Sequence, residues 1–330
     1  MTGNVEIYPL IFKPVYKDYL WGGARIPKLF CRDEPDGVYA ESWEVSTRPE
    51  GHSVVVNGVL AGKTLQEVID RYGVKLLGNL RDTQSFPLLI KIIDAAQDLS
   101  VQVHPGAETV ARSGGEHKTE AWYVLDAPSN ARIYAGLKPG TDESVIKSAV
   151  GSGTLEKHLV SRNVKAGDLI FIPGGRVHAI GAGCLILEVQ LNSNTTFRLY
   201  DWDRVGHDGK KRDLHLKESL LAIDWKNADV ISEPISTTSS CEQVQDLLKT
   251  PYFEMSKIRI DSGDKLKISN ACFDVLFVEK GNVTVIYGDS EPLRVGVGTS
   301  VLVPAELGVY GLATDEEAVL LRTTVPASSC

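Results

Sequence analysis

The stretch from Gly167 to His178 constrains the fold of this chain more than any other part of the sequence. It reads GDLIFIPGGRVH, and its apolar run, Leu169 to Ile172, is short enough for one buried strand. Proline fixes φ and glycine tolerates positive φ, so the Pro-Gly-Gly segment that follows predicts a sharp turn. The strand after that turn would carry His178 inward. The stretch therefore predicts two short strands and a tight turn that brings a histidine into the protein.

Two further segments place side chains of the kinds that bind metals. Strand side chains alternate between faces, so the sequence VQVHP puts Gln102 and His104 on one face of a strand. Further along, Glu120 precedes the apolar run Ala121 to Leu125, which predicts a carboxylate at the start of a strand. Together with His178, these residues form a set of four nitrogen and oxygen donors suited to zinc or iron.

The donor set also predicts what a bound metal could do. Two neutral histidines, a neutral glutamine and one carboxylate leave a divalent ion with a net charge of about +1. That charge can polarise a carbonyl or hydroxyl group and stabilise a developing alkoxide or enediolate. The residues alone leave a second interpretation open, in which His104, Glu120 and His178 form an iron facial triad with open coordination positions.

The pattern G-x5-P-x-G-x2-H resembles the second motif of the cupin superfamily, whose members are small β-barrels that hold a metal in their mouths. Part of this motif occurs again near the end of the chain. The segment from Gly298 to Pro304 repeats the glycine, the five residues and the proline, but Val309 stands where the first copy has His178. The repeat therefore predicts a second barrel that keeps the turn and lacks the metal ligand.

We therefore expect a mainly β protein of two cupin barrels of the jelly-roll type, with a small helical portion. Residues 1–240 would form a metal-binding barrel with short helical insertions, and residues 241–330 a cupin-like barrel without metal ligands. The polar segment 226–243 is typical of a linker. In the second barrel, two apolar runs at 273–279 and 283–287 flank a Gly-Asn pair, which predicts a hairpin.

Elsewhere the pattern predicts mostly short strands. Strands are expected at Ile7 to Phe12, Val54 to Val56, Phe86 to Ile93, 131–137 and Leu185 to Gln190, and helices at Thr64 to Leu77, 138–160 and Leu214 to Trp225. Thr64 can cap the first helix, because Glu67 lies three residues on. Lys91 is the single charge inside an apolar strand, which indicates either a salt-bridged lysine or a ligand-binding one.

The composition limits the partners. The chain has 330 residues, is 43% hydrophobic, and carries a net charge of −8 with a pI near 5.5, which argues against nucleic acid or an anionic membrane as partner. No apolar run approaches the length of a membrane helix, and the N-terminal sequence MTGNVEIYPL lacks a charged segment followed by an apolar core. We therefore expect a cytoplasmic protein. An anionic substrate would need a local cluster of lysine and arginine, and no pattern predicts an oligomeric state.

Several motifs in order resemble one family closely. They read WGG, FPLLIKIIDAAQDLSVQVHP, HKTEAWYVLDA, GDLIFIPGGRVHAI and NSNTTFRLYDWDR, and they extend from about residue 8 to about residue 225. These segments resemble the short bacterial form of type I phosphomannose isomerase, a zinc-dependent family that interconverts mannose 6-phosphate and fructose 6-phosphate. The resemblance implies one zinc ion per chain and a sugar phosphate as substrate. The short connection between Glu120 and His178 lacks the large helical insertion of the eukaryotic enzymes.

The resemblance also implies roles for individual residues. The positions that match the zinc ligands of the family are Gln102, His104, Glu120 and His178. Lys91 and Ser100 match positions associated with the substrate phosphate. Lys118 and Arg198 match an active-site lysine and arginine of the family.

The identity of the base stays open at this point. Aldose–ketose isomerisation through a cis-enediol moves one proton between C2 and C1 and another between the two oxygens, so it needs a base near C2 and an electrophile on the oxygens. Lys118 shares a strand face with Glu120 and is therefore expected to point towards the metal, whose charge favours the neutral amine. His117 is an alternative base, although its side chain should lie on the opposite face.

Two other classes of function fit part of the pattern. A cupin oxygenase could use Fe(II) on the two histidines and the carboxylate, but it offers no role for Gln102 or for the lysine and arginine set. A non-catalytic sugar-binding cupin would bind sugar phosphate without turning it over. Metal analysis and an isomerase assay separate these alternatives.

Overall fold

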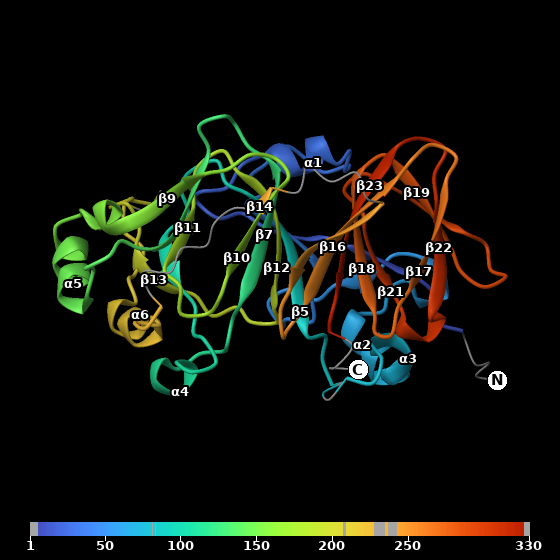
Figure 1. The fold of residues 1–330 in the computed structure, drawn as a ribbon, viewed down its shortest axis with the longest axis horizontal. Coiled ribbons are helices and arrows are strands. Elements are labelled where there is room, and N and C mark those ends of the chain that lie inside the picture. Colours follow the sequence, from blue (N-terminus) through green and yellow to red (C-terminus); the bar gives the residue numbers. More distant parts are fainter. Residues whose placement is uncertain are drawn as a thin grey trace.

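The computed structural model describes residues 6–80, 82, 84–206, 209–227, 235–236 and 243–326. Two antiparallel β-barrels lie side by side (Figure 1). Each barrel consists of a seven-stranded sheet and a smaller sheet. The expected mainly β class is confirmed. Most of the segment 226–243, predicted to be a linker, lies outside the described residues.

The first barrel is built from the middle of the chain. Its larger sheet has the order β14 (Ile235–Ser236), β10 (Asp168–Ile172), β7 (Glu120–Asp126), β12 (Leu185–Leu191), β5 (Leu88–Asp94), β3 (Glu41–Val45) and β2 (Val15–Lys17). Its smaller sheet has the order β13 (Phe197–Tyr200), β6 (Val101–Val103), β11 (His178–Ile180), β8 (Arg132–Leu137) and β9 (Leu159–Asn163). The strands around the Pro-Gly-Gly turn, β10 and β11, therefore belong to opposite sheets of one barrel.

The second barrel combines the C-terminal part of the chain with two strands from its beginning. Its larger sheet has the order β15 (Val244–Lys249), β16 (Glu254–Ile260), β23 (Ala318–Thr324), β18 (Asp274–Lys280), β21 (Ser300–Val303), β1 (Leu10–Lys13) and β4 (Val54–Val55). Its smaller sheet has the order β17 (Lys265–Ser269), β22 (Val309–Ala313), β19 (Asn282–Ile286) and β20 (Leu293–Gly296). Leu10 pairs with Leu302 across this sheet. The division of the chain into two domains at residue 240 remains a proposal. The second barrel also includes β1 and β4, which come from the beginning of the chain.

The predicted hairpin at 273–287 is wrong. Strands β18 and β19 follow each other in the chain, but β18 pairs with β21 and β23, whereas β19 pairs with β20 and β22. Gly281, with a φ of 75°, turns the chain from one sheet of the barrel into the other. A glycine between two apolar runs looks the same in sequence whether the next strand pairs locally or crosses the barrel.

The helices are shorter than the sequence predicts. They are α1 (Arg25–Leu29), α2 (Leu65–Tyr72), α3 (Val74–Leu77), α4 (Val110–Ser113), α5 (Glu143–Gly151) and α6 (Leu216–Ala222), with 3-10 turns at Gly58–Leu60, Leu155–His158 and Ala305–Leu307. In Figure 1, α4, α5 and α6 lie towards the outer end of the first barrel, α1 above the middle of the molecule, and α2 and α3 below the second barrel. Thr64 caps α2 in a capping box with Glu67, but Gly73, with a φ of 47°, ends that helix before α3. In the described part of the chain, no helix has the length and apolar character needed to cross a bilayer.

The alternation along β7 determines what lies inside the first barrel. Trp122 packs in the interior with Ile170 and Ile180, whereas its neighbour Tyr123 packs on the outer face with Phe277 of the second barrel. The two seven-stranded sheets therefore meet back to back through their apolar outer faces. Glu120 has the same parity as Trp122, so its carboxylate points into the first barrel.

Candidate active site

Three strands of the first barrel bring the predicted ligands together. Glu120 begins β7, Gln102 lies in β6, and His178 begins β11, where it pairs in register with Gln102. His104 follows directly after β6. The turn before β11 requires glycine at position 174, because a Cβ atom there would lie 2.5 Å from the Cα atom of Gly106 in the facing loop.

The donor atoms converge on one buried point. The distance from His104 Nε2 to Glu120 Oε2 is 3.3 Å, and the distance from His178 Nε2 to Glu120 Oε1 is also 3.3 Å. The ligand atoms of these three residues all lie within 4.8 Å of one another, and all three side chains are buried. The side-chain amide nitrogen of Gln102 lies 3.3 Å from His178 Nε2.

Backbone carbonyls fix the tautomer of both histidines. His104 Nδ1 lies 2.8 Å from the carbonyl oxygen of Thr195, and His178 Nδ1 lies 2.8 Å from that of Arg176. A carbonyl oxygen only accepts, so each Nδ1 must carry the proton and donate it. Each Nε2 then presents a lone pair to the shared point, which is the arrangement that metal-ligating histidines use.

The environment also keeps both imidazoles neutral and Glu120 ionised. Burial lowers the pKa of His104 to about 4, and the positive charge of Lys118 acts in the same direction. Burial likewise lowers the pKa of His178. Burial opposes ionisation of Glu120, but the positive charge of Lys118 outweighs it and holds the pKa of this carboxyl well below its usual range. Neutral imidazoles and an ionised carboxylate are the protonation states in which these groups bind metal.

The carboxylate is the best test of whether a metal fits. Glu120 is fully buried, and Lys118 Nζ forms an ion pair with its Oε2 at 2.9 Å, but neither oxygen has a hydrogen-bond donor in suitable geometry among the described residues. Buried carboxylate oxygens are costly without a partner. A divalent cation between the two Nε2 lone pairs and this carboxylate would satisfy all of them, so His104, Glu120 and His178 could hold a metal ion.

Of the two candidate bases, only one lies at this point. Lys118 Nζ lies 2.9 Å from Glu120 Oε2 and 3.1 Å from His104 Nε2, and its side chain is buried. His117 instead packs edge-on against Tyr252 of the second barrel, with ring centroids 5.0 Å apart. Both residues precede β7, which begins at Glu120, and their side chains contact different parts of the molecule.

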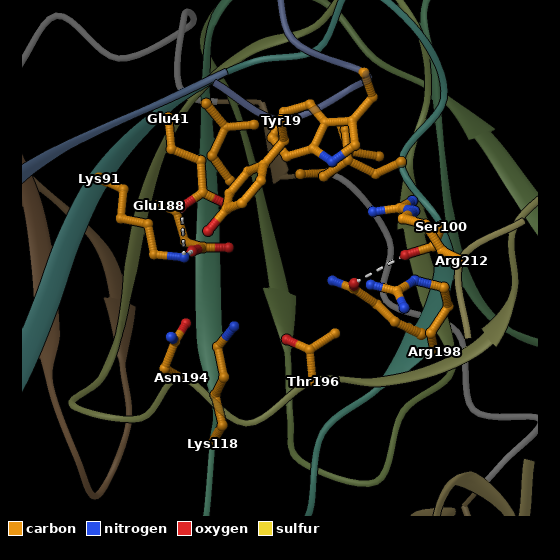
Figure 2. A pocket seen from close by; sticks show the side chains of 15 residues that line it. Tyr19, Glu41, Lys91, Ser100, Lys118, Glu188, Asn194, Thr196, Arg198 and Arg212 are labelled. Atoms are coloured by element: carbon orange, nitrogen blue, oxygen red, sulfur yellow. Dashed lines mark hydrogen bonds and ion pairs between the residues drawn. The ribbon is translucent and has the colours of Figure 1, made fainter. Parts of the chain in front are cut away.

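A cavity of about 250 Å³ adjoins this cluster and contains the other predicted site residues. Lys91, Ser100, Lys118 and Arg198 all line it. Figure 2 shows Lys91 on one side, Ser100 and Arg198 on the opposite side, and Lys118 between them. The sequence-based set therefore lies in one pocket.

Lys91 lines the pocket and is paired with carboxylates. Its ammonium lies 2.9 Å from Glu188 Oε2 and 3.6 Å from Glu41 Oε2, and Lys91 is only 5% exposed. Burial opposes its charge, but Glu188 and then Glu41 outweigh burial and raise the pKa of Lys91. Lys91 is thus a salt-bridged lysine in the wall of the pocket.

The sequence patterns miss several residues of this pocket. Glu41, Glu188 and Arg212 line it together with the uncharged Tyr19, Asn194 and Thr196. Glu188 carried a usable signal, because it interrupts the apolar strand β12 just as Lys91 interrupts β5, and the two pair in register. Arg212 follows a polar loop in which no periodicity marks it.

A family profile and the curated relatives of this chain both point to phosphomannose isomerases. The family profile "Phosphomannose isomerase type I, catalytic domain" matches residues 10–128. The chain is 38% identical over 320 residues to mannose-6-phosphate isomerase ManA of Bacillus subtilis (strain 168), which covers 94% of this chain and 98% of that protein. It is 37% identical over 265 residues to the mannose-6-phosphate isomerase of Streptococcus mutans serotype c, which covers 78% of this chain and 81% of that protein.

A solved structure is similar over nearly the whole length. The crystal structure of the mannose 6-phosphate isomerase from Bacillus subtilis superimposes with a TM-score of 0.85 at 28% sequence identity. The match covers 97% of this chain and 100% of that one, so it includes both barrels.

Proposed function

The chain belongs to the type I phosphomannose isomerase family, and we propose that it interconverts mannose 6-phosphate and fructose 6-phosphate at the buried cluster of the first barrel. The observation that carries this proposal is the convergence of two imidazole Nε2 atoms and an ionised carboxylate on one point, with the amine of Lys118 beside it. The cluster opens into a pocket of a size and polarity suited to a small polar substrate.

The proposed metal is one zinc ion per chain. Its ligands would be Gln102, His104, Glu120 and His178. The nitrogen and oxygen donors without sulfur are compatible with zinc, and a divalent ion bound there would polarise the oxygens on C1 and C2 of the open-chain sugar. The side-chain oxygen of Gln102 would face the metal once the amide group rotates by half a turn. This rotation exchanges the amide nitrogen and oxygen, which occupy equivalent volumes.

Lys118 is the proposed proton carrier. A bound cation beside Lys118 would favour its neutral amine. That amine would accept the proton from C2 of mannose 6-phosphate and return it to C1, while the hydroxyl proton on the C2 oxygen passes to the C1 oxygen, so the aldose becomes the ketose with no gain or loss of atoms. The close contact with Glu120 and His104 keeps the lysine side chain extended towards the substrate oxygens. His117 would not take this role, because it packs against Tyr252 away from the pocket.

The remaining residues would bind and orient the substrate. Arg198 is a fork of donors that suits phosphate or sugar oxygens, and Ser100 offers a hydroxyl. Lys91 belongs to the proposed binding set by resemblance, and it contributes an ammonium that is already paired with carboxylates. A phosphate that does not react anchors the sugar, so its binding energy positions C1 and C2 at the metal.

A coupled isomerase assay tests this proposal directly. Purified protein should convert mannose 6-phosphate, lose activity on chelation, and regain it with one equivalent of zinc. Free mannose should be a very poor substrate. Bound iron with no isomerisation would favour the oxygenase alternative, and tight binding of mannose 6-phosphate without turnover would favour a binding protein.

A further inference from the structure

The two ends of the pocket carry opposite charge. At one end, the single cation Lys91 faces two carboxylates, Glu41 and Glu188, all three of them at most 9% exposed. Glu188 also accepts a hydrogen bond from the indole nitrogen of Trp122, and Glu41 accepts one from that of Trp43. One ammonium beside two carboxylates gives this end a net negative charge.

The opposite end carries unbalanced positive charge. Arg198 pairs with no carboxylate among the described residues, and one of its terminal nitrogens donates to the backbone carbonyl of Asp213 at 2.7 Å. Its Nε is buried without a hydrogen-bond partner in the described part of the chain. Burial lowers the pKa of Arg198, and repulsion from Arg212 is the next largest cause. An anion at this end would therefore relieve a real electrostatic cost.

Arg212 adds a second guanidinium to the same end. It donates to both oxygens of Asp201, from Nε at 2.8 Å and from a terminal nitrogen at 2.5 Å. Asp201 is buried, and it also accepts a hydrogen bond from Arg204 at 3.0 Å. The single carboxylate of Asp201 thus pairs with two guanidinium groups, so the three side chains together carry a net positive charge. The two hydrogen bonds from Arg212 hold its guanidinium in a fixed orientation.

We propose that Arg212, together with Arg198 and Ser100, binds the phosphate group of the substrate at the end of the pocket opposite Lys91. Figure 2 shows these three side chains on one side and the Lys91–Glu188 pair on the other. The inference rests on the proposed function, because it assigns an orientation to the sugar phosphate in that same pocket. It makes Arg212 a specificity-determining residue, with Asp201 as the residue that positions it.

The physical reason is the charge of the ligand. A phosphate monoester carries about −1.5 to −2 at neutral pH and accepts several charge-assisted hydrogen bonds. Two carboxylates beside Lys91 would repel it, whereas guanidinium forks match its oxygens. The Lys91–Glu188 pair offers one donor and one acceptor, and such a pair suits the hydroxyl groups of the sugar.

Replacing Arg212 with glutamine tests the assignment. Arg212→Gln should raise the KM for mannose 6-phosphate by about 10- to 100-fold and leave kcat within a factor of about three, because the lost bonds form before the chemical step. The inhibition constant of inorganic phosphate should rise by a similar factor. Arg294→Gln is the matched control, since it removes an exposed arginine of the second barrel and should change neither constant.

A second measurement covers the case in which Arg212→Gln does not fold. Crystals of the wild-type protein soaked with tungstate, a heavy analogue of phosphate, should show the anion between Arg198 and Arg212. An anion bound at Lys91, or an unchanged KM and phosphate inhibition constant in folded Arg212→Gln, would overturn the assignment. Both outcomes leave the isomerase proposal intact, because that proposal fails only when the wild-type protein does not isomerise mannose 6-phosphate.

Discussion

Glu120 in the first barrel and Asp274 in the second occupy the same position in their sheets. Each is the first residue of its strand, β7 or β18, and each lies between two antiparallel neighbours, β10 and β12 in the first barrel and β21 and β23 in the second. Both carboxylates are fully buried. The repeat seen in the sequence therefore extends to a buried acid in each barrel.

The two carboxylates differ in what surrounds them. Glu120 faces two imidazole lone pairs and a lysine, whereas Asp274 accepts a hydrogen bond from the hydroxyl of Tyr310 at 2.8 Å and pairs with Arg322 at 2.8 Å. A guanidinium from strand β23 thus balances Asp274, whereas the carboxylate of the first barrel faces two histidines and the amine of Lys118. The barrel frame alone does not make a metal site, because the same buried acid can be balanced by the protein's own cation.

The aligned position in the second barrel needs one correction. The sequence alignment places Val309 opposite His178, but Val309 is 56% exposed and the next residue, Tyr310, points to the carboxylate. The 3-10 turn Ala305–Leu307 and Gly308 add one residue to the turn that follows the proline. The expected absence of a histidine ligand at this place is unaffected.

The largest effect is expected from removing a ligand of the first barrel. His178→Ala should reduce bound metal from about one to near zero per chain and lower kcat/KM by at least about three orders of magnitude, since the electrophile is lost. Metal analysis and the coupled assay measure both. Tyr310→Phe, the matched change in the second barrel, should keep both values. Full metal content in His178→Ala would break the comparison.

The next effect concerns Lys118. Lys118→Met keeps the length and bulk of the side chain and removes the amine, so turnover should fall by about two to four orders of magnitude with unchanged metal content. Steady-state kinetics on metal-loaded protein measure the change. Near-normal turnover would mean that Lys118 only balances the charge of Glu120, as Arg322 balances that of Asp274, and the barrels would then differ less than we infer.

Removing the internal cation of the second barrel should affect stability instead of activity. Arg322→Leu leaves Asp274 buried without its counter-charge, which should cost about 3–5 kcal/mol in the free energy of unfolding. The shift in the urea midpoint measures this loss. Adding Asp274→Asn should recover part of it, because the unpaired charge disappears. If the double variant is no more stable than Arg322→Leu, the ion pair is not what stabilises this core.

The smallest effect is a dependence on pH. Burial raises the pKa of Asp274, although Arg322 opposes the shift. The folded protein holds this proton more tightly than the unfolded chain, so the group's stabilising contribution is complete below its unfolded pKa of about 3.9 and is lost as pH rises through the folded pKa. The stability of the wild type relative to Asp274→Asn should therefore fall as the pH rises above about 4. Urea titrations across this range measure it, and a constant difference would contradict the raised pKa.

The candidate site could be predicted from the sequence because each donor has a local signal. Alternation along a strand places Gln102 and His104, and the Pro-Gly-Gly turn places His178. Glu188 also interrupts an apolar strand, but that local signal does not predict that it pairs with Lys91, because the two meet only once β5 and β12 are paired.

The fold class was predictable, but the pairing of distant strands was not. The apolar runs and turn residues indicate strands wherever they occur, and most of the predicted strands exist. They do not state which strands pair, so the crossing at Gly281 was mistaken for a hairpin. The same limit hid the contribution of β1 and β4 to the second barrel, since their partners lie far along the chain.

The place of β1 has a consequence for how the protein is made. Leu10 leaves the ribosome long before its partner Leu302, which lies far along the chain. At about 5 to 20 residues per second, the first strand waits roughly 15 to 60 s for its place in the sheet. During this interval the strands that carry the candidate metal ligands are completed, while the edge of β1 that pairs with β21 stays open. A nascent chain therefore exposes this edge at a stage when most strands of the first barrel have already been made.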